Sequence, residues 1–592
     1  MSQAAERLSW AISQHQSGNT AAAEAAYRQL IADEPQAPTA WHCLGVLCLQ
    51  TGRTPDAIEC ISHAIRLAPN NAEYYNHLGA ALSAAERHDE ALAALRRAVQ
   101  INPHSAASHY NLGTALRNAG QLESAVASFR YAVAADPQAA EAHYNLGNAL
   151  NELKRADEAE ASYRQALAIR PDYVRAMVNL GNVLWQKKQL EESLTLLRRA
   201  TSLAPTNAIA AQALGTVLRD TGRLDEAVGW LRKAAEIDPN TAETQNNLGT
   251  VLQALTDFAG AQACYERALA LNPKLPDAHF SHATLRLRQG HLVEGFAEYE
   301  WRWKCSGWAD RGFRQPRWDG SPLDGATILL YGEQGLGDTL QFVRYAQVAK
   351  TLGAGRTIVE CQAPLVKVLA GCSFVDQVLS FNSPLPPFDV HAPLMSCPAI
   401  LGESLETLET KARQWSPYLK ADSKLIDKWR EKLSAYAGLR VGICWQGNRE
   451  NLFDAQRSFP LTSFEPIARV PGVKLFNLQK GEGAQQLAGA DFEVIDLGPI
   501  DEESGPFMDT AAIMMTLDLL ITSDTSIAHL AGALGVPTWI ALAAHADWRW
   551  MFEREDTPWY PTMRLFRQRK LGEWGPVLER MAGEIKSLRN DR

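Results

Sequence analysis

Two nearly identical stretches, HYNLGTAL at residues 109–116 and HYNLGNAL at residues 143–150, decide how the first half of this chain folds. They begin 34 residues apart, and a proline keeps the same spacing from Pro35 to Pro273. A glycine follows the same period at Gly45, Gly79, Gly113, Gly147, Gly181, Gly215 and Gly249. Self-similarity at a fixed period of this length indicates a stack of repeated helical units.

The 34-residue period resembles the tetratricopeptide repeat, a pair of antiparallel helices. In that family the glycine lets the two helices approach, a small residue lies at their contact, and the proline ends the second helix. The small residues here are Ala57, Ala91, Ala125, Ala159, Ala227 and Ala261, with Ser193 at the remaining position. We therefore predict an all-α tetratricopeptide repeat solenoid over residues 1–290, with a decayed repeat near residues 276–300.

The sixth position of each repeat points to the concave inner surface in this family, and here it is mostly asparagine. The residues are Asn111, Asn145, Asn179 and Asn247, with His77 and Ala213 at equivalent positions. An amide both donates and accepts hydrogen bonds, so such a row can bind an extended peptide backbone. The row resembles the asparagine ladder of eukaryotic O-linked N-acetylglucosamine transferases, which implies a protein or peptide acceptor. The alternative is that these asparagines are a common feature of bacterial repeats and bind nothing.

Composition and charge narrow the classes of function. The formal net charge of -9 gives no basic footprint for nucleic acid. The nine cysteines contain no CxxC pair, which fits a reducing compartment and argues against a zinc site. The first 20 residues lack the apolar run of a signal peptide, and Gly535 and Pro537 break the uncharged stretch 525–546. We expect a cytoplasmic protein without stable membrane insertion.

In the second half, short apolar runs alternate with helical stretches. The runs expected as buried strands are 326–332, 356–361, 375–381 and 388–394, then 439–447, 473–481, 492–498, 518–523 and 537–542. This alternation indicates parallel sheets covered on both faces. We predict an α/β region of two Rossmann-like lobes, 321–425 and 426–592, after a junction at 291–320, with ligands at the carboxyl ends of the strands.

A glycine-rich turn, YGEQGLGDTL at residues 331–340, follows the first predicted strand. It lacks the ending of a P-loop and the spacing of a dinucleotide-binding loop. Gln334, Gly335 and Gly337 are candidates to approach an acceptor. Asp338 begins a helix, where its carboxylate either caps that helix or faces a ligand between the lobes.

A second polar segment, SDTSIAH at residues 523–529, follows another predicted strand. Asp524, Thr525 and Ser526 bring hydroxyl groups and free backbone N–H groups to the start of a helix, which favours an anion. His529 lies one turn into that helix and is expected to point to the same pocket.

Several motifs of the second half together resemble the heptosyltransferase-like domain (glycosyltransferase family nine) that bacteria fuse to tetratricopeptide repeats. They include EYEWRW, PRWDG, EQGLGDTLQFVRY, VGICWQGN, RSFPL, LQKG and ITSDTSIAHLAGALGVP. The resemblance implies a GT-B fold whose second lobe binds a nucleotide diphospho-sugar as co-substrate, with no metal or other cofactor. It implies that Asp338 is the catalytic base and that Asp524, Thr525, Ser526 and His529 hold the donor.

Further donor contacts are expected at the ends of second-lobe strands. Gln446 and Asn448 are polar candidates, and Arg457 and Lys480 are basic candidates that could equally be surface charges.

The tryptophan-rich segment 547–561 has two interpretations. Trp548, Trp550, Trp559 and Tyr560 could stack on a base or sugar, but such a density of aromatic residues favours packing of lobe against lobe. Arg549 and Arg554 are candidate phosphate contacts in the same segment.

The predicted function is an inverting glycosyltransferase that acts on a protein recruited by the repeats. One alternative is a non-catalytic repeat scaffold with a degenerate transferase domain. Another is a lipopolysaccharide-type sugar transferase, which the absence of a basic or amphipathic lipid-facing stretch disfavours.

Overall fold

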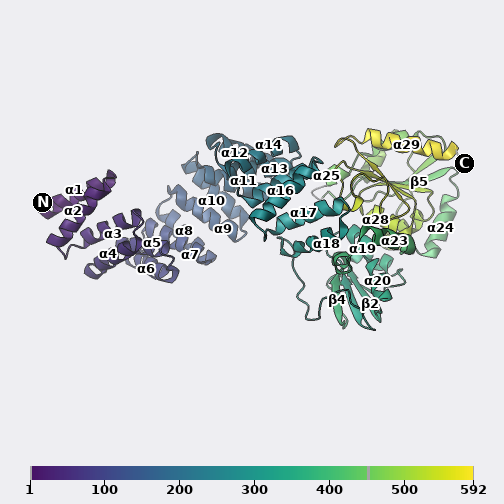
Figure 1. The fold of residues 1–592 in the computed structure, drawn as a ribbon. Coiled ribbons are helices and arrows are strands. Elements are labelled where there is room, and N and C mark those ends of the chain that lie inside the picture. Colours follow the sequence, from purple (N-terminus) through teal and green to yellow (C-terminus); the bar gives the residue numbers. More distant parts are fainter. Residues whose placement is uncertain (1–2, 450–453, 591–592) are drawn as a thin grey trace. The chain divides into compact units, whose positions relative to one another are not determined.

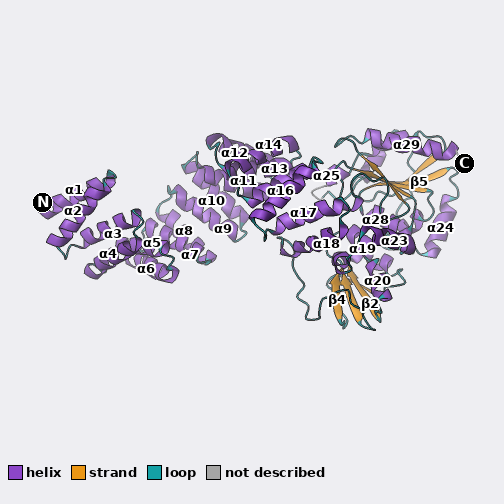
Figure 2. Ribbon diagram, in the orientation of Figure 1, coloured by secondary structure: helices purple, strands orange, loops and turns teal. Residues whose placement is uncertain are grey.

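The computed structural model describes residues 3–449 and 454–590. Its contacts divide the chain into two compact units, Met1–Pro239 and Asn240–Arg592, which are described separately below. Figure 1 follows the elements along the chain, and Figure 2 distinguishes helices from strands. This division falls within the repeats, and the domain boundaries predicted from the sequence stay predictions.

The first unit is built from seven antiparallel helix pairs within its described residues. They are α1 (Gln3–Gln16), α2 (Thr20–Asp33), α3 (Pro38–Gln50), α4 (Thr54–Leu67), α5 (Ala72–Ala84), α6 (His88–Ile101), α7 (Ala106–Asn118), α8 (Leu122–Ala135), α9 (Ala140–Glu152), α10 (Ala156–Ile169), α11 (Val174–Gln186), α12 (Leu190–Leu203), α13 (Ala208–Asp220) and α14 (Leu224–Ile237). The predicted tetratricopeptide solenoid is confirmed.

The repeated glycine is required by the packing of each helix pair. A Cβ atom on Gly147 would lie 2.6 Å from the Tyr163 ring, and one on Gly113 would lie 2.8 Å from the Phe129 ring. The exceptional small residue, Ser193, has no exposed surface and donates its hydroxyl to the carbonyl of Gly181 at 2.7 Å. The serine thus replaces alanine without leaving an unpaired polar group.

The second unit begins with two more helix pairs, including the repeat that was expected to be decayed. They are α15 (Ala242–Ala254), α16 (Phe258–Leu271), α17 (Pro276–Arg288) and α18 (Leu292–Tyr299). Phe296 of α18 packs edge-on against Trp548, with ring centroids 5.6 Å apart. The last repeat therefore shares its core with the α/β region.

The α/β region holds two sheets with parallel pairing throughout, as predicted. The first has the order β3-β2-β1-β4, and the second has the order β6-β5-β7-β8-β9. Their bounds are β1 (Thr327–Tyr331), β2 (Arg356–Cys361), β3 (Gln377–Ser380), β4 (Val390–Pro393), β5 (Leu439–Cys444), β6 (Val473–Asn477), β7 (Leu519–Ser523), β8 (Thr538–Leu542) and β9 (Met563–Arg567).

Two strand predictions need correction. The run 492–498 makes only an isolated bridge between Ile495 and Phe476, and the chain soon turns at Gly498, where φ is 77°. Conversely, β9, the strand beside β8, was not predicted from the sequence. Its alternation of apolar residues with arginines is short and closely follows the tryptophan-rich segment 547–561.

Helices and 3-10 turns connect the strands. They are η1 (Glu300–Lys304), α19 (Leu336–Phe342), α20 (Tyr345–Thr351), η2 (Ala363–Leu365), α21 (Val366–Leu369), η3 (Leu394–Ser396), α22 (Cys397–Ile400), α23 (Leu405–Trp415), α24 (Ser423–Leu433), α25 (Asp454–Arg457), η4 (Leu461–Phe464), α26 (Glu465–Ala468), η5 (Ala484–Gly489), α27 (Met508–Met514), α28 (Ser526–Leu534), η6 (Trp548–Trp550) and α29 (Gly575–Asn590).

Buried polar and aromatic side chains join the two lobes. The Arg344 guanidinium, which is 2% exposed, donates to the Trp559 carbonyl at 2.8 Å and to the Tyr418 hydroxyl at 3.1 Å. Trp548, Trp550, Trp559 and Tyr560 are all buried. These four rings are used for packing, which is the second of the two interpretations given above.

Within the described residues, the structure contains no helix both long and apolar enough to cross a membrane.

Candidate functional site

The strand order determines where each lobe can present polar residues. In the first sheet the chain crosses from one side of β1 to the other to form β4, and in the second it crosses over β5 to form β7. Ligands of parallel sheets bind beyond the carboxyl ends of strands at such switch points. The predicted residues lie in these loops: Gln334 to Asp338 after β1, Gln446 and Asn448 after β5, and Asp524 to Ser526 after β7.

The loops after β1 and β7 meet through helices α19 and α28. A Cβ atom on Gly337 would lie only 2.6 Å from Cδ2 of His529. The second glycine of GLGD therefore allows α19 to lie directly on α28. This contact brings the two polar segments singled out in the sequence together.

Asp338 uses both carboxylate oxygens. Oδ2 accepts the backbone N–H of Gly335 at 2.8 Å, so Asp338 does cap α19. Oδ1 forms an ion pair with the Arg549 guanidinium, which comes from the second lobe. Burial raises the pKa of Asp338, although the charge of Arg549 and the Gly335 N–H oppose this shift. A carboxylate whose pKa is raised is a better proton acceptor at neutral pH.

Arg549, predicted only as a candidate phosphate contact, is the central cation of this site. Its Nη1 donates to Asp547 at 2.8 Å, and its guanidinium lies 4.3 Å from the centroid of the Trp548 ring. Its Nε is buried and has no hydrogen-bond partner among the described residues. The sequence gives no clear indication of this role, because Arg549 lies between two tryptophans whose density favours packing.

The start of α28 adds further polar groups to the same site. The Ser523 hydroxyl is buried without a hydrogen-bond partner in the described chain, and Thr525 is buried at the N-cap position. Burial and the nearby Asp547 raise the pKa of Asp524 to about 6, while the charge of Arg457 lowers it. Arg457 also acts on Asp338, which places its charge near both carboxylates.

His529 is fully enclosed. Its Nδ1 is 2.9 Å from the Tyr560 hydroxyl, and its ring stacks on Trp550 with centroids 5.3 Å apart. Burial, helped by the charge of Arg549, lowers the pKa of His529 to about 3. The imidazole is therefore neutral at pH 7, and its ring packs against Gly337.

The remaining donor candidates have partners of their own. Lys480 Nζ lies 2.9 Å from Asp501 Oδ2, and the Gln446 side-chain oxygen is 3.4 Å from Gln486 Nε2. Asn448 lies in the loop after β5. Arg554 forms ion pairs with Glu409 and Asp556.

On the acceptor side, Gln334 donates to the Tyr299 hydroxyl at 3.1 Å. Gly335 is the exposed residue of the turn. The loop after β1 thus presents a backbone position to solvent beside the ion pair of half-buried Asp338 with buried Arg549.

The predicted asparagine row has hydrogen bonds within the repeats. Asn145 donates to the Tyr110 hydroxyl at 3.0 Å, and Asn179 donates to Asn148 at 2.8 Å. Asn111 is half-buried on α7, and Asn247 lies on α15 in the second unit. A polar cavity of about 300 Å³ is lined by Asn179 together with Arg117, Tyr144, Asn148, Asn151, Glu152, Tyr163 and Asn182.

Comparison with known proteins places the repeats in a defined class. Models described as tetratricopeptide repeat match residues 36–104, 82–127, 110–174, 172–240 and 207–274. These ranges cover the predicted periodic glycines, so the chain carries a tetratricopeptide repeat scaffold.

One curated relative is Protein FlbA of Caulobacter vibrioides, 27% identical over 336 residues, which are 52% of this chain. The chain spans only 55% of the length of FlbA.

Solved repeat structures resemble parts of the chain. YrrB, whose structure is described as a TPR protein with an unusual peptide-binding site, is 27% identical with a TM-score of 0.27, covering 31% of this chain and 95% of YrrB. PilF of Pseudomonas aeruginosa is 22% identical with a TM-score of 0.32, covering 35% of this chain and 94% of that one.

Proposed function

We propose that this protein is an inverting glycosyltransferase of GT-B architecture. It moves a sugar from a nucleotide diphospho-sugar to a hydroxyl group of an acceptor. The repeats recruit that acceptor, which we propose to be a protein or peptide. No metal ion takes part, since helix N-termini and basic side chains neutralise the leaving diphosphate.

One observation carries the proposal: Asp338 of the first lobe contacts Arg549 of the second, next to the start of α28. The first lobe thereby places the proposed base, Asp338, beside the groups of the second lobe that would bind the donor phosphate. The unpartnered Ser523 hydroxyl and Arg549 Nε support an anionic ligand, because buried donors are rarely left without acceptors.

The chemical step is a single displacement. Asp338 removes the proton from the acceptor hydroxyl as its oxygen forms a bond to the anomeric carbon. The bond from that carbon to the diphosphate oxygen breaks, and the nucleoside diphosphate departs with the electron pair. The backbone N–H groups at the start of α28, with Arg549 and Arg457, stabilise its negative charge.

Arg549 makes donor binding precede proton removal by Asp338 in the proposed reaction. Its ion pair with Asp338 occupies the proposed base before the donor binds. A diphosphate carries more negative charge than one carboxylate and accepts bidentate hydrogen bonds from arginine. Donor binding therefore draws Arg549 from Asp338 and leaves the carboxylate available to the acceptor.

The test separates binding from chemistry. Calorimetry with a panel of nucleoside diphosphates should give binding to the wild-type chain and to Asp338→Asn. Turnover of the matching nucleotide sugar should fall about 100- to 10,000-fold in Asp338→Asn. Asp427→Asn, an exposed change on α24, serves as the control and should keep both properties.

The scaffold alternative rests on the same pair of residues. Both oxygens of Asp338 are already engaged, as a purely structural helix cap would be. A chain that binds none of the nucleotides, and whose acceptor binding resides wholly in the repeats, would establish this alternative instead. Normal turnover in Asp338→Asn would remove this residue from the mechanism while leaving the enzyme.

A further inference from the structure

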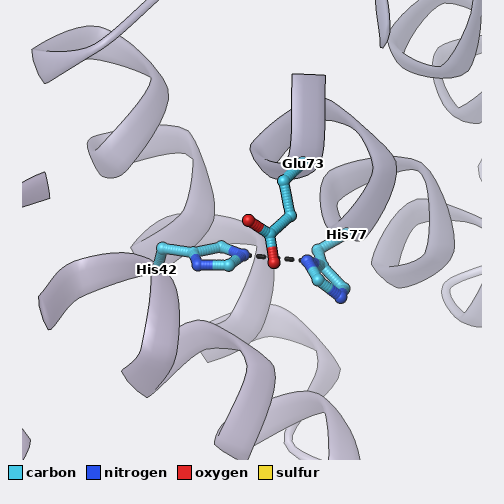
Figure 3. A group of neighbouring side chains, drawn as sticks. All are labelled: His42, Glu73 and His77. Carbon is cyan, nitrogen blue, oxygen red and sulfur yellow. Dashed lines mark hydrogen bonds between the residues drawn. The ribbon is translucent and has the colours of Figure 1, made fainter. Parts of the chain in front are cut away.

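Two histidines and a glutamate from neighbouring repeats point to one place in the first unit (Figure 3). His42 comes from α3, while Glu73 and His77 lie one turn apart on α5. His42 Nε2 is 2.8 Å from His77 Nδ1, and one ligand atom from each of the three residues lies within 4.8 Å of the others. His42 is buried and Glu73 is exposed, so the group opens to solvent on the glutamate side.

The positions of the two histidines recur in later repeats with different chemistry. Tyr110 and Asn145 are also 35 residues apart, and the amide donates to the tyrosine hydroxyl at 3.0 Å. Tyr144 and Asn179 repeat this bond at 3.3 Å. The link between neighbouring repeats can therefore be made by tyrosine and asparagine, and the packing at this level does not require two imidazoles.

The chemistry of the three side chains matches a divalent transition metal ion. Imidazole nitrogen and carboxylate oxygen are common zinc ligands, and two histidines with one glutamate form a known set of three. His42 Nε2 and His77 Nδ1 face each other at 2.8 Å, so both nitrogens lie where one ion could replace the hydrogen bond between them. The Tyr74 ring packs against the His42 ring, with centroids 4.5 Å apart, and restricts its orientation.

We propose that His42, Glu73 and His77 bind one Zn²⁺ ion, which links helices α3 and α5 of adjacent repeats. Zinc–nitrogen distances near 2.0–2.1 Å and tetrahedral angles require the two nitrogens to be about 3.3 Å apart. The rings therefore separate by about half an ångström when the ion replaces their hydrogen bond, while the Glu73 carboxylate already points toward them (Figure 3). The fourth position stays open to water or to a side chain of a bound protein.

A second group of two histidines and a glutamate differs from the first because an arginine also contacts its carboxylate. His279 and His282 both contact Glu298, at 2.8 and 3.1 Å, but Arg286 also reaches this carboxylate at 3.1 Å. The arginine already neutralises the glutamate and repels a cation. His42, Glu73 and His77 have no such cation among their described hydrogen bonds and ion pairs.

The matched variant is provided by the repeats themselves. His42→Tyr combined with His77→Asn recreates the Tyr–Asn bond of the later repeats and removes two of the three ligands. Circular dichroism and thermal unfolding in the presence of a chelator should show that this double variant folds as the wild type does. His88→Asn, at an exposed position at the start of α6, is the control for histidine content.

The experiment is calorimetric titration of the tag-free, reduced full chain with ZnCl2, with MgCl2 in parallel. Wild type and His88→Asn should bind one more equivalent of Zn²⁺ than the double variant, or bind it at least about tenfold more tightly. Cobalt should give the wild type a tetrahedral visible spectrum that the double variant lacks. Equal zinc affinity and stoichiometry in all three proteins would overturn the proposal. The inference concerns the repeats alone and is independent of sugar transfer.

Discussion

The repeats and the α/β region bring their key residues together over very different distances in sequence. In the repeats, Gly147 meets Tyr163 of the same helix pair, and Tyr110 bonds to Asn145 of the next repeat. In the α/β region, Asp338 and Arg549 are 211 positions apart, and Arg344 and Trp559 are 215 apart. A stack of repeats is stabilised by neighbours, whereas the proposed site depends on contacts that the whole second unit must hold.

The largest expected difference in stability between the two regions follows from a substitution of Arg344. Arg344→Met removes a buried cation that donates to Trp559, Tyr418 and Gln341, leaving their oxygens without this partner. We expect a loss of about 3–5 kcal/mol in the free energy of unfolding of the α/β region. Denaturant unfolding measures this loss, and Arg356→Met at the exposed start of β2 is the matched control.

Equal shifts in the unfolding of the first and the second unit in Arg344→Met would contradict the division of the chain into two compact units. The expected result is a shift of one transition with the other unchanged.

The next effect tests the contact between α19 and α28. Gly337→Ala places a Cβ atom 2.6 Å from the buried His529 ring, and such overpacking costs about 1–3 kcal/mol. It should also weaken nucleotide binding, because α19 and Asp338 shift with the glycine. Thermal unfolding and calorimetry are the measurements.

Gly335→Ala is the matched change two residues earlier. Its Cβ would meet only Asp338 Oδ2, at 3.2 Å, so stability should change by less than in Gly337→Ala. Equal losses in the two variants would contradict the importance of the α28 contact, because alanine favours a helix more than glycine does.

In the repeats, two glycine changes of opposite sign are expected. Gly147→Ala meets the Tyr163 ring at 2.6 Å and should destabilise by about 1–3 kcal/mol. Gly229, inside α14, has open space where a Cβ would lie, so Gly229→Ala should stabilise by about 0.5–1 kcal/mol. Circular dichroism melts of both variants measure these effects, and a loss in each would refute the assigned packing.

The last expected effect concerns the pH dependence of stability. The pKa of Asp524 is raised to about 6 in the folded protein from an ordinary value near 3.8. The folded state then binds more protons between these values, so stability falls as pH rises through about 4 to 6. Asp524→Asn removes this loss, and should gain about 1–2 kcal/mol over wild type between pH 4 and pH 7, after allowance for partial exposure.

Unfolding at a series of pH values checks the prediction, with Asp427→Asn as an exposed control. A gain of the same size at pH 4 would point to a steric cause, because Asp524 is already protonated there in the folded state.

Much of the repeat fold could be predicted because its signals are local and recur. Gly113 and Gly147 mark the same contact in successive repeats, so one pattern defines many helix pairs. The parallel sheets were also predictable, since buried strands of this kind have continuous apolar runs. Strand β9 was not predicted, because Arg564 and Arg567 interrupt its run of apolar residues.

The candidate site was predictable only in part. Asp338 and SDTSIAH each follow a strand, and the general rule for parallel sheets places both at the carboxyl edge. The partnership of Asp338 with Arg549 has no sequence signal, because it depends on how two lobes face each other. His529 was expected to point into a pocket for the donor, but Tyr560 and Trp550 enclose it. It lies on an apolar helix that is buried, and the Tyr560 hydroxyl provides the hydrogen-bond partner that a buried imidazole needs.

The anchoring of Arg344 also limits how the second unit can move. This side chain fastens the end of α19 to Trp559 and to Tyr418 in the segment between the lobes. If the lobes swing apart to admit a sugar nucleotide, the axis of rotation must pass close to this anchor, where little displacement is tolerated. In that case the largest displacements would fall on the loops farthest from Arg344.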